Sequence, residues 1–221
     1  MERYLVDDVL PPELVSGIEP GRNLLISGPP MTGKRELLLG LLAQGTAADE
    51  GAIVVTTRER ATDLLDGFAA LSGGERTRVS VIDTVSARSA VADLERLGPV
   101  KHVSSPGELT GIGMKFSELA RDARDAGVSN IRVGVDSLSP MLMYVDLQQL
   151  FRFLHVFTSQ IQAQNWLGLF VLEPDSHDEQ AVNTLQQLFD GVLDFRLGED
   201  GTRAVRLRGM GDGPTDWFEI D

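Results

Sequence analysis

The chain runs from the apolar segment Asn23 to Ser27 into Gly28-Pro29-Pro30-Met31-Thr32-Gly33-Lys34, which is followed by Arg35 and Glu36. This stretch fits the pattern G-x-x-x-x-G-K between a strand and a helix. Glycines let the backbone turn tightly, while successive N–H groups and the helix N-terminus supply partial positive charge for phosphates, which the lysine can also reach. A simple Gly/Pro turn would leave the lysine and the preceding strand unexplained. We therefore expect these residues to bind a nucleotide.

Arg35 departs from this pattern, because the position after the lysine normally carries Ser or Thr, whose hydroxyl binds Mg²⁺. A guanidinium has five N–H donors and no acceptor, so it cannot bind a cation. We expect Mg²⁺ binding to be weakened or rearranged here. Arg35 could instead contact a phosphate directly.

Short apolar segments alternate with amphipathic ones along most of the chain, which is typical of parallel strands covered by helices. The predicted strands are Asn23 to Ser27, Ala52 to Thr57, Arg78 to Asp83, Ile131 to Asp136, Leu167 to Leu172 and Val192 to Leu197. The predicted helices are Lys34 to Gln44, Ala61 to Leu71, Lys115 to Ala126, Asp146 to Gln164 and Glu179 to Phe189. The fold class predicted is α/β, with a mainly parallel sheet flanked by helices.

The C-terminal segment has no helices, since Thr202 to Arg208 and Trp217 to Ile220 are separated only by a turn at Gly211 to Pro214. This pattern predicts an antiparallel hairpin. We find no internal repeat or linker, and 221 residues suit one α/β domain spanning residues 1–221.

Asp136 closes the segment Ile131 to Val135, about 100 residues after the loop. A carboxylate at the carboxyl end of a central strand is where a nucleotide-bound Mg²⁺ is often held, commonly through water. Many strands also end in Asp only to begin a turn. We expect Asp136 to be the metal-side carboxylate.

Composition excludes several kinds of site. The chain has no cysteine and three widely spaced histidines, so cysteine chemistry and a histidine metal site are not expected. No apolar run approaches the roughly 20 residues of a membrane span, and the charged N-terminus does not resemble a signal peptide. We expect a soluble, cytoplasmic protein.

Acidic residues outnumber basic ones, with 33 Asp and Glu against 20 Lys and Arg. Only Lys34, Lys101 and Lys115 are lysines. An acidic, lysine-poor surface suits molar salt, where charges are screened over about 3 Å, and we expect a halophilic source, although an ordinary acidic protein is the alternative. The net charge of −13 disfavours binding to nucleic acid.

Several of these segments together resemble the KaiC/RadA branch of RecA-like ATPases: Gly28 to Lys34, the strand ending at Thr57, and Val133-Gly134-Val135-Asp136-Ser137-Leu138-Ser139. Arg206-Leu207-Arg208-Gly209 and Trp217-Phe218-Glu219-Ile220 resemble that branch's C-terminal hairpin, which often reaches toward a neighbouring subunit's nucleotide. The resemblance spans Leu10 to Ile220, is looser from Ala87 to Gly113, and is strongest to short KaiC-like proteins of halophilic archaea. It implies a RecA-like P-loop domain that binds ATP and Mg²⁺. It also allows a homo-oligomer in which Arg206 and Arg208 act in trans, with Arg203 beside them.

The resemblance also suggests where the reaction chemistry is weakened. Active relatives carry two glutamates after the second strand, and the first polarises water. Alignment on Leu64 puts Arg58 at the first position and Glu59 at the second, and a protonated guanidinium cannot act as a base. Glu59 is therefore the remaining catalytic candidate, although Arg58 to Arg60 also fits a solvated turn before a helix capped near Thr62. Glu173, which follows Leu172, is either a γ-phosphate sensor or a strand-end carboxylate.

Two further motifs have structural interpretations. Ser105-Pro106-Gly107-Glu108 has capping-box spacing and predicts the start of a short helix. Gly111-Ile112-Gly113 predicts a hinge between two helical pieces, with an anion-binding nest as the alternative.

The residues favour a regulatory protein that binds ATP, hydrolyses it weakly or not at all, and controls a protein partner or its own assembly. A nucleotide-free scaffold is supported by Arg35 and Arg58 and opposed by Gly28, Gly33 and Lys34. A DNA-associated ATPase would need a basic, aromatic-containing loop, and the sequence offers none.

Overall fold

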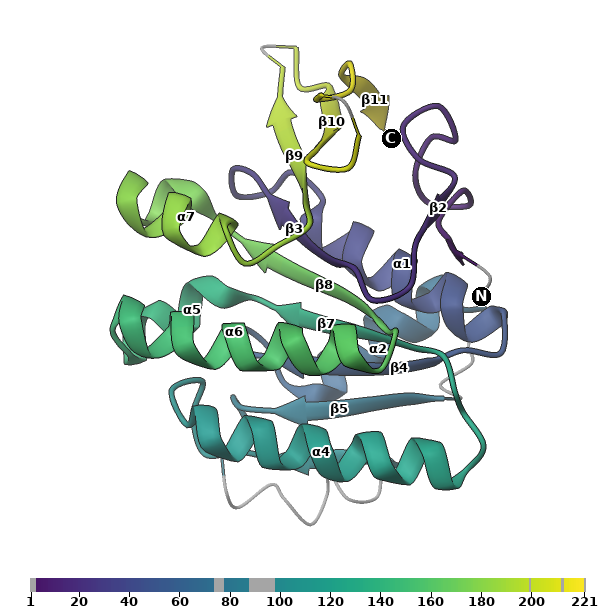
Figure 1. Cartoon of the computed structure of the whole chain (residues 1–221), viewed down its shortest axis with the longest axis vertical. Coiled ribbons are helices and arrows are strands. Elements are labelled where there is room, and N and C mark those ends of the chain that lie inside the picture. The colour runs from purple at the N-terminus through teal and green to yellow at the C-terminus, as the bar shows by residue number, and fades with distance from the viewer. Residues whose placement is uncertain (1–2, 74–77, 88–97, 199, 212, 221) are drawn as a thin grey trace.

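The computed structural model describes residues 3–73, 78–87, 98–198, 200–211 and 213–220 (Figure 1). Within these residues a nine-stranded sheet has the order β11-β10-β9-β3-β8-β7-β4-β5-β6. Pairing is parallel from β9 to β6 and antiparallel between β9, β10 and β11. The strands are β3 (Asn23–Ser27), β4 (Gly51–Thr56), β5 (Val79–Asp83), β6 (Val100–His102), β7 (Ile131–Asp136), β8 (Leu167–Leu172), β9 (Gly191–Leu197), β10 (Arg203–Arg208) and β11 (Phe218–Ile220).

Helices cover both faces of the sheet, because most central strands are apolar on both sides. Side chains that alternate along β3 and β4 enter two separate cores. One core contains α1 (Lys34–Ala47), α2 (Ala61–Leu71) and the N-terminal segment with β1 (Tyr4–Leu5) and β2 (Gly17–Ile18). The other contains α4 (Leu109–Asp125), α5 (Leu138–Tyr144), α6 (Leu147–Ala163) and α7 (Glu179–Gln186). In Figure 1, α4 and α6 cross in front of the sheet and α1 lies behind it.

The helix after the loop packs closely on the centre of the sheet, and Gly134 of β7 makes this possible. A Cβ atom there would lie 3.0 Å from Leu42 and 3.3 Å from Leu38 of α1. Along β7, Arg132, Gly134 and Asp136 share this face, whereas Val133 and Val135 enter the opposite core. The α1 side of β7 therefore carries a buried charge at each end.

Arg132 holds the amino edge of the sheet together. Its side chain is completely buried and donates to Glu50 (2.6 Å) and to the backbone carbonyls of Leu41 (2.7 Å) and Leu5 (2.8 Å). It also lies 5.7 Å from the ring centroid of Tyr4. One guanidinium thus ties α1, the start of β4 and the N-terminal strand together, which offsets the cost of burying it.

The six predicted strands and five predicted helices are present, with boundaries shifted by a few residues. The terminal antiparallel hairpin is confirmed. The paired strands β1 and β2, the edge strand β6 and helix α5 were not predicted, because two- and three-residue strands carry almost no periodicity. Among the described residues no helix is both long and apolar enough to span a bilayer.

Two local predictions were wrong. Ser105 to Glu108 form a turn, and α4 begins only at Leu109, because the Glu108 carboxylate accepts hydrogen bonds from Ser104 instead of capping a helix at Ser105. Gly111 to Gly113 lie within the continuous helix α4, so they form neither a hinge nor an anion nest. Helix α2 begins at Ala61, as predicted, with Arg60 as its N-cap near the expected Thr62, and the backbone N–H of Ala61 donates to Asp83 at 2.8 Å.

Glu50→Ala should lower the free energy of unfolding by about 3–5 kcal/mol, because it leaves a buried guanidinium without its counter-charge. Adding Arg132→Met should recover part of that loss by removing the unpaired charge. Urea unfolding measures both effects. Glu118→Ala is the matched control, since this carboxylate pairs with Lys115 at a more exposed position and its loss should cost about 1 kcal/mol or less. Equal losses for the two single variants would contradict a buried hub at Arg132.

Candidate functional site

Four parallel strand ends bring the candidate residues to one edge of the sheet. The order β3-β8-β7-β4 places the loop after β3 beside Glu173 at the end of β8, then Asp136 at the end of β7, then Arg58 and Glu59 after β4. Carboxyl ends of neighbouring parallel strands commonly form ligand sites. Arg58 and Glu173, which are 115 positions apart in the sequence, thus form a direct contact.

The loop Gly28 to Gly33 turns sharply into α1. Gly33 caps this 14-residue helix with φ 86°, a conformation that favours glycine. Gly28 packs so closely on β9 that a Cβ atom would lie 2.6 Å from the Cβ of Phe195. The first and last glycines of the motif are therefore required by the backbone.

Lys34 is buried within this loop, where its ammonium donates to the carbonyl of Pro29 and lies 3.4 Å from the Thr32 hydroxyl. Thr32 donates to the same carbonyl at 2.9 Å. Burial lowers the pKa of Lys34, and Arg58 lowers it further, while the charges of Glu173 and Asp136 oppose this. The ammonium is therefore held inside the loop by weak neutral acceptors, which an anion could replace. Pro30, Met31 and Glu36 are exposed around it.

Asp136 is 1% exposed, and neither of its carboxylate oxygens has a hydrogen-bond partner among the described residues. Burial raises its pKa to about 6; Arg58 and Arg35 act in the opposite direction, and Glu59 and Glu173 raise it further. The backbone around it is well bonded, since Thr57 donates to and accepts from Ser137 at 2.7 Å. The unpartnered carboxylate is therefore held firmly in place.

Arg35 lies between the two carboxylates of this edge. Its Nε donates to Oε1 of Glu59 at 2.8 Å, Nη2 donates to the same oxygen, and Nε is 3.8 Å from Oδ2 of Asp136. A second pair joins Arg58 to Glu173 at 2.6 Å. Both arginines that depart from the expected motifs are thus paired with carboxylates of the site.

A family model described as a family of unknown function (DUF7504) matches residues 21–195. The chain belongs to this family. The DUF7504 match begins just before β3 and ends within β9, so it includes the loop, Glu59, Asp136 and Glu173. No curated protein matches the chain.

The DUF7504 chain is also similar to the crystal structure of a KaiC-like protein from the hyperthermophilic archaeon Pyrococcus horikoshii. The likeness covers 100% of this chain and 95% of the other, with a TM-score of 0.72 and 16% sequence identity. At that identity the likeness concerns the fold alone. It confirms the predicted α/β fold with a mainly parallel sheet, flanking helices and a C-terminal hairpin.

The acidic residues of this DUF7504 site do not fit a divalent cation as they stand. Arg35 occupies the place of the hydroxyl ligand, Glu59 is paired with it, and Glu173 is paired with Arg58. Among the described residues no group of three or more His, Asp or Glu side chains is arranged to hold a metal. Asp136 accepts no hydrogen bond among the described residues, but Arg35 lies 3.8 Å from its Oδ2.

Two residues that support the site were not singled out from the sequence. Asp83 closes β5 and accepts from the backbone of Ala61, Val85 and Ser86, each at 2.8 Å. Burial acts to raise the pKa of Asp83, but the hydrogen bonds from Ser86, Ala61 and Val85 outweigh it, and the pKa is lowered. The hydroxyl of Ser139 accepts from the Glu173 N–H at 3.0 Å. The strand-end position of Asp83, shared with Asp136, was the available signal.

The hairpin arginines interact with their own chain. Arg206 donates to Asp194 at 3.0 Å, and Arg208 binds the same carboxylate through two nitrogens. Arg206 also lies 4.6 Å from the ring centroid of Trp217. Arg203 reaches the loop, since a Cβ atom on Gly33 would lie 2.7 Å from its Nη1. A role of Arg206 and Arg208 in trans stays a prediction.

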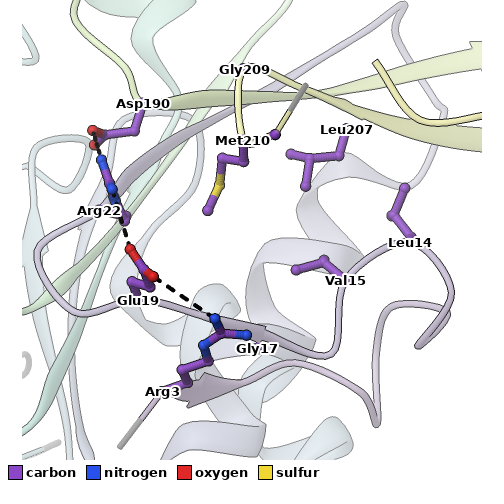
Figure 2. Close-up of a pocket in the computed structure, with 11 residues that line it drawn as sticks. Arg3, Leu14, Val15, Gly17, Glu19, Arg22, Asp190, Leu207, Gly209 and Met210 are labelled. Atoms are coloured by element: carbon purple, nitrogen blue, oxygen red, sulfur yellow. Dashed lines mark hydrogen bonds and ion pairs between the residues drawn. The ribbon is translucent and has the colours of Figure 1, made fainter. Parts of the chain in front are cut away.

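One cavity, of about 500 Å³, adjoins the loop at Gly33. Its charged lining residues are Arg203 and the acidic Asp7, Asp8, Glu36 and Glu219. Another of about 390 Å³ lies between the N-terminal segment and the end of β10 (Figure 2). On the wall of the second, Arg22 binds Asp190 (2.9 Å) and Glu19 (3.3 Å), and Arg3 is 3.8 Å from Glu19. These charged side chains pair with one another and hold two segments of the chain together. They therefore leave few free polar groups for a ligand.

Asp136→Asn should stabilise the protein at pH 8 by about 2–3 kcal/mol and change little at pH 4. Because its pKa rises from 3.8 to about 6 on folding, the folded state binds more protons than the unfolded state between these values. The carboxyl group therefore lowers stability progressively as the pH rises through this window. Urea unfolding of the wild type and the variant from pH 4 to 8 measures this effect as the difference between their free energies of unfolding. A difference that does not change with pH would contradict it.

Proposed function

We propose that this protein binds ATP at Gly28 to Glu36, hydrolyses it slowly or not at all, and uses the bound state to control a protein partner or its own assembly. The observation that carries the proposal is the buried ammonium of Lys34, which is held by neutral oxygens inside a loop at the start of a 14-residue helix. A phosphate would be a stronger acceptor for that ammonium than a carbonyl. The helix N-terminus adds partial positive charge at the same place.

The cavity beside Gly33 leaves about 500 Å³ of space next to the loop, although apart from Arg203 its charged lining residues are the acidic Asp7, Asp8, Glu36 and Glu219. Arg203 lines this cavity and lies against the loop. Phosphates bound at the loop would thus be close to a second cation that carries no ion pair among the described residues.

Weak hydrolysis follows from the partners of the candidate catalytic groups. Glu59, the remaining candidate base, accepts two hydrogen bonds from Arg35. Both bonds end on Oε1 and hold the carboxylate against Arg35, so that oxygen is not free to approach a water molecule. Arg58 stands at the first glutamate position of the related ATPases and is itself bound to Glu173. A water molecule near the phosphates would therefore meet no free base among these side chains.

A regulatory role fits this combination of retained binding and weakened chemistry. In this role Glu173 is the sensor. It releases Arg58 when a terminal phosphate binds nearby, and so couples the end of β8 to the nucleotide. Assembly through the hairpin would require Arg206 and Arg208 to leave Asp194. The acidic, lysine-poor composition suits a cytoplasm rich in salt, and argues against DNA as the partner.

Titration calorimetry of ATP into the protein in molar KCl, with and without Mg²⁺, should show micromolar binding. Lys34→Ala should weaken it roughly 10- to 100-fold, because it removes a charged hydrogen-bond donor to phosphate. Lys115→Ala is the matched control, since this lysine pairs with Glu118 on α4 and should leave the affinity unchanged. Phosphate release on the same samples should be negligible. The absence of binding in every condition would favour the scaffold, and turnover on the order of one per second would favour an active ATPase.

A further inference from the structure

The guanidinium of Arg35 occupies the side of the site where a divalent cation would be bound in an active relative. It contacts Glu59 through Nε (2.8 Å) and Nη2, and its Nε is 3.8 Å from Asp136. These are the two carboxylates that the sequence assigned to catalysis and to the metal. A permanent positive charge thus already stands between them, because arginine stays protonated under all ordinary conditions.

The fold provides space for this side chain. Gly67 lies in the middle of α2, where glycine is unfavourable for a helix. A Cβ atom at Gly67 would lie 3.0 Å from Nη2 and 3.3 Å from Nη1 of Arg35. The helix therefore approaches the guanidinium closely, and the side chain is 28% exposed. Arg35 is seated against two elements and still open to a ligand on one side.

The charges at this edge are balanced without a metal. Lys34, Arg35 and Arg58 supply the cations, and Glu59, Asp136 and Glu173 supply the anions. A divalent cation placed beside Arg35 would be repelled by its charge, and the three carboxylates around it, Glu59, Asp136 and Glu173, each already lie within 3.8 Å of an arginine. A triphosphate, in contrast, brings the acceptors that a guanidinium binds through two parallel hydrogen bonds.

We propose that Arg35 is the permanent counter-ion of this site, so that the protein binds nucleoside triphosphate free of divalent metal. This inference rests on the proposed function, because it concerns how the same loop recognises phosphates. Arg35 shares its donors between Glu59 and the phosphates, and Lys34 leaves the Pro29 carbonyl for them. Binding then depends on arginine and lysine, and added Mg²⁺ contributes nothing to affinity.

The test is calorimetric titration of ATP into the full chain in molar KCl with excess EDTA or with excess MgCl₂. The wild-type affinity should be at least as high in EDTA as in Mg²⁺. Arg35→Ser restores the hydroxyl of the usual motif and should weaken binding in EDTA roughly 10- to 100-fold, the loss of a charge-assisted hydrogen bond to phosphate. Mg²⁺ should then restore much of the affinity of this variant. Arg35→Lys keeps the positive charge but cannot form two parallel hydrogen bonds. Its ATP affinity in EDTA should lie between those of the wild type and Arg35→Ser.

Each outcome decides a different statement. Wild-type binding that requires Mg²⁺ would overturn the counter-ion inference and leave the proposed function standing. No wild-type binding in either condition would overturn the proposed function itself. If Arg35→Ser does not fold, as judged by its thermal unfolding, the wild-type comparison and Arg35→Lys still decide. Equal affinity of a folded Arg35→Ser in EDTA would also overturn the inference. Gly67→Ala, which displaces the guanidinium by a few tenths of an ångström and keeps its charge, should weaken binding in EDTA less than Arg35→Ser does.

Discussion

Parallel pairing of β3, β8, β7 and β4 is the constraint on which the candidate site depends. Each of these strands delivers its C-terminal residues to the same edge, so a loop lysine and carboxylates from three other strand ends meet without any local sequence signal. The close packing of α1 on Gly134 fixes how deeply the loop and Arg35 enter this edge. The register of the sheet therefore decides which charges become neighbours.

The two buried charges of β7, Arg132 at its amino end and Asp136 at its carboxyl end, differ in their hydrogen bonding. At the amino edge, Arg132 is completely buried and bonded to a carboxylate and two carbonyls, so its desolvation is compensated by geometry. At the carboxyl edge, Asp136 is almost as deeply buried and has no hydrogen-bond partner among the described residues. Satisfied buried networks specify structure, whereas an unsatisfied buried group needs another explanation. The contrast assigns the amino edge to stability and supports the ligand site proposed at the carboxyl edge.

The sequence was sufficient for the central sheet because its strands are continuously apolar and its helices strongly periodic. The rule for parallel strands placed the loop and Asp136 at one edge, and the resemblance to KaiC/RadA-like ATPases added Glu59 and Glu173. Partners could not be predicted. Nothing in the order of residues indicates that Arg35 reaches across to Glu59 from α1, that Arg58 turns to Glu173, or that Asp83 caps α2 from a neighbouring strand. These contacts depend on side-chain directions that are set by packing. The capping box predicted at Ser105 was wrong for the same reason, because the Glu108 side chain turns to Ser104.

Two arginines separate this site from that of an active ATPase of similar fold, and they act by the same physical means. A guanidinium paired with a carboxylate occupies oxygens that would otherwise bind a metal or accept a proton. Arg35 pairs in this way with Glu59 and lies 3.8 Å from Oδ2 of Asp136, and Arg58 pairs with Glu173. Neither arginine disturbs Gly28, Gly33 or Lys34, whose backbone and ammonium would recognise phosphates in the proposed function. Under that proposal binding and hydrolysis depend on different residues of one edge, so a chain could lose the second and retain the first, and fold likeness alone does not determine which state it occupies.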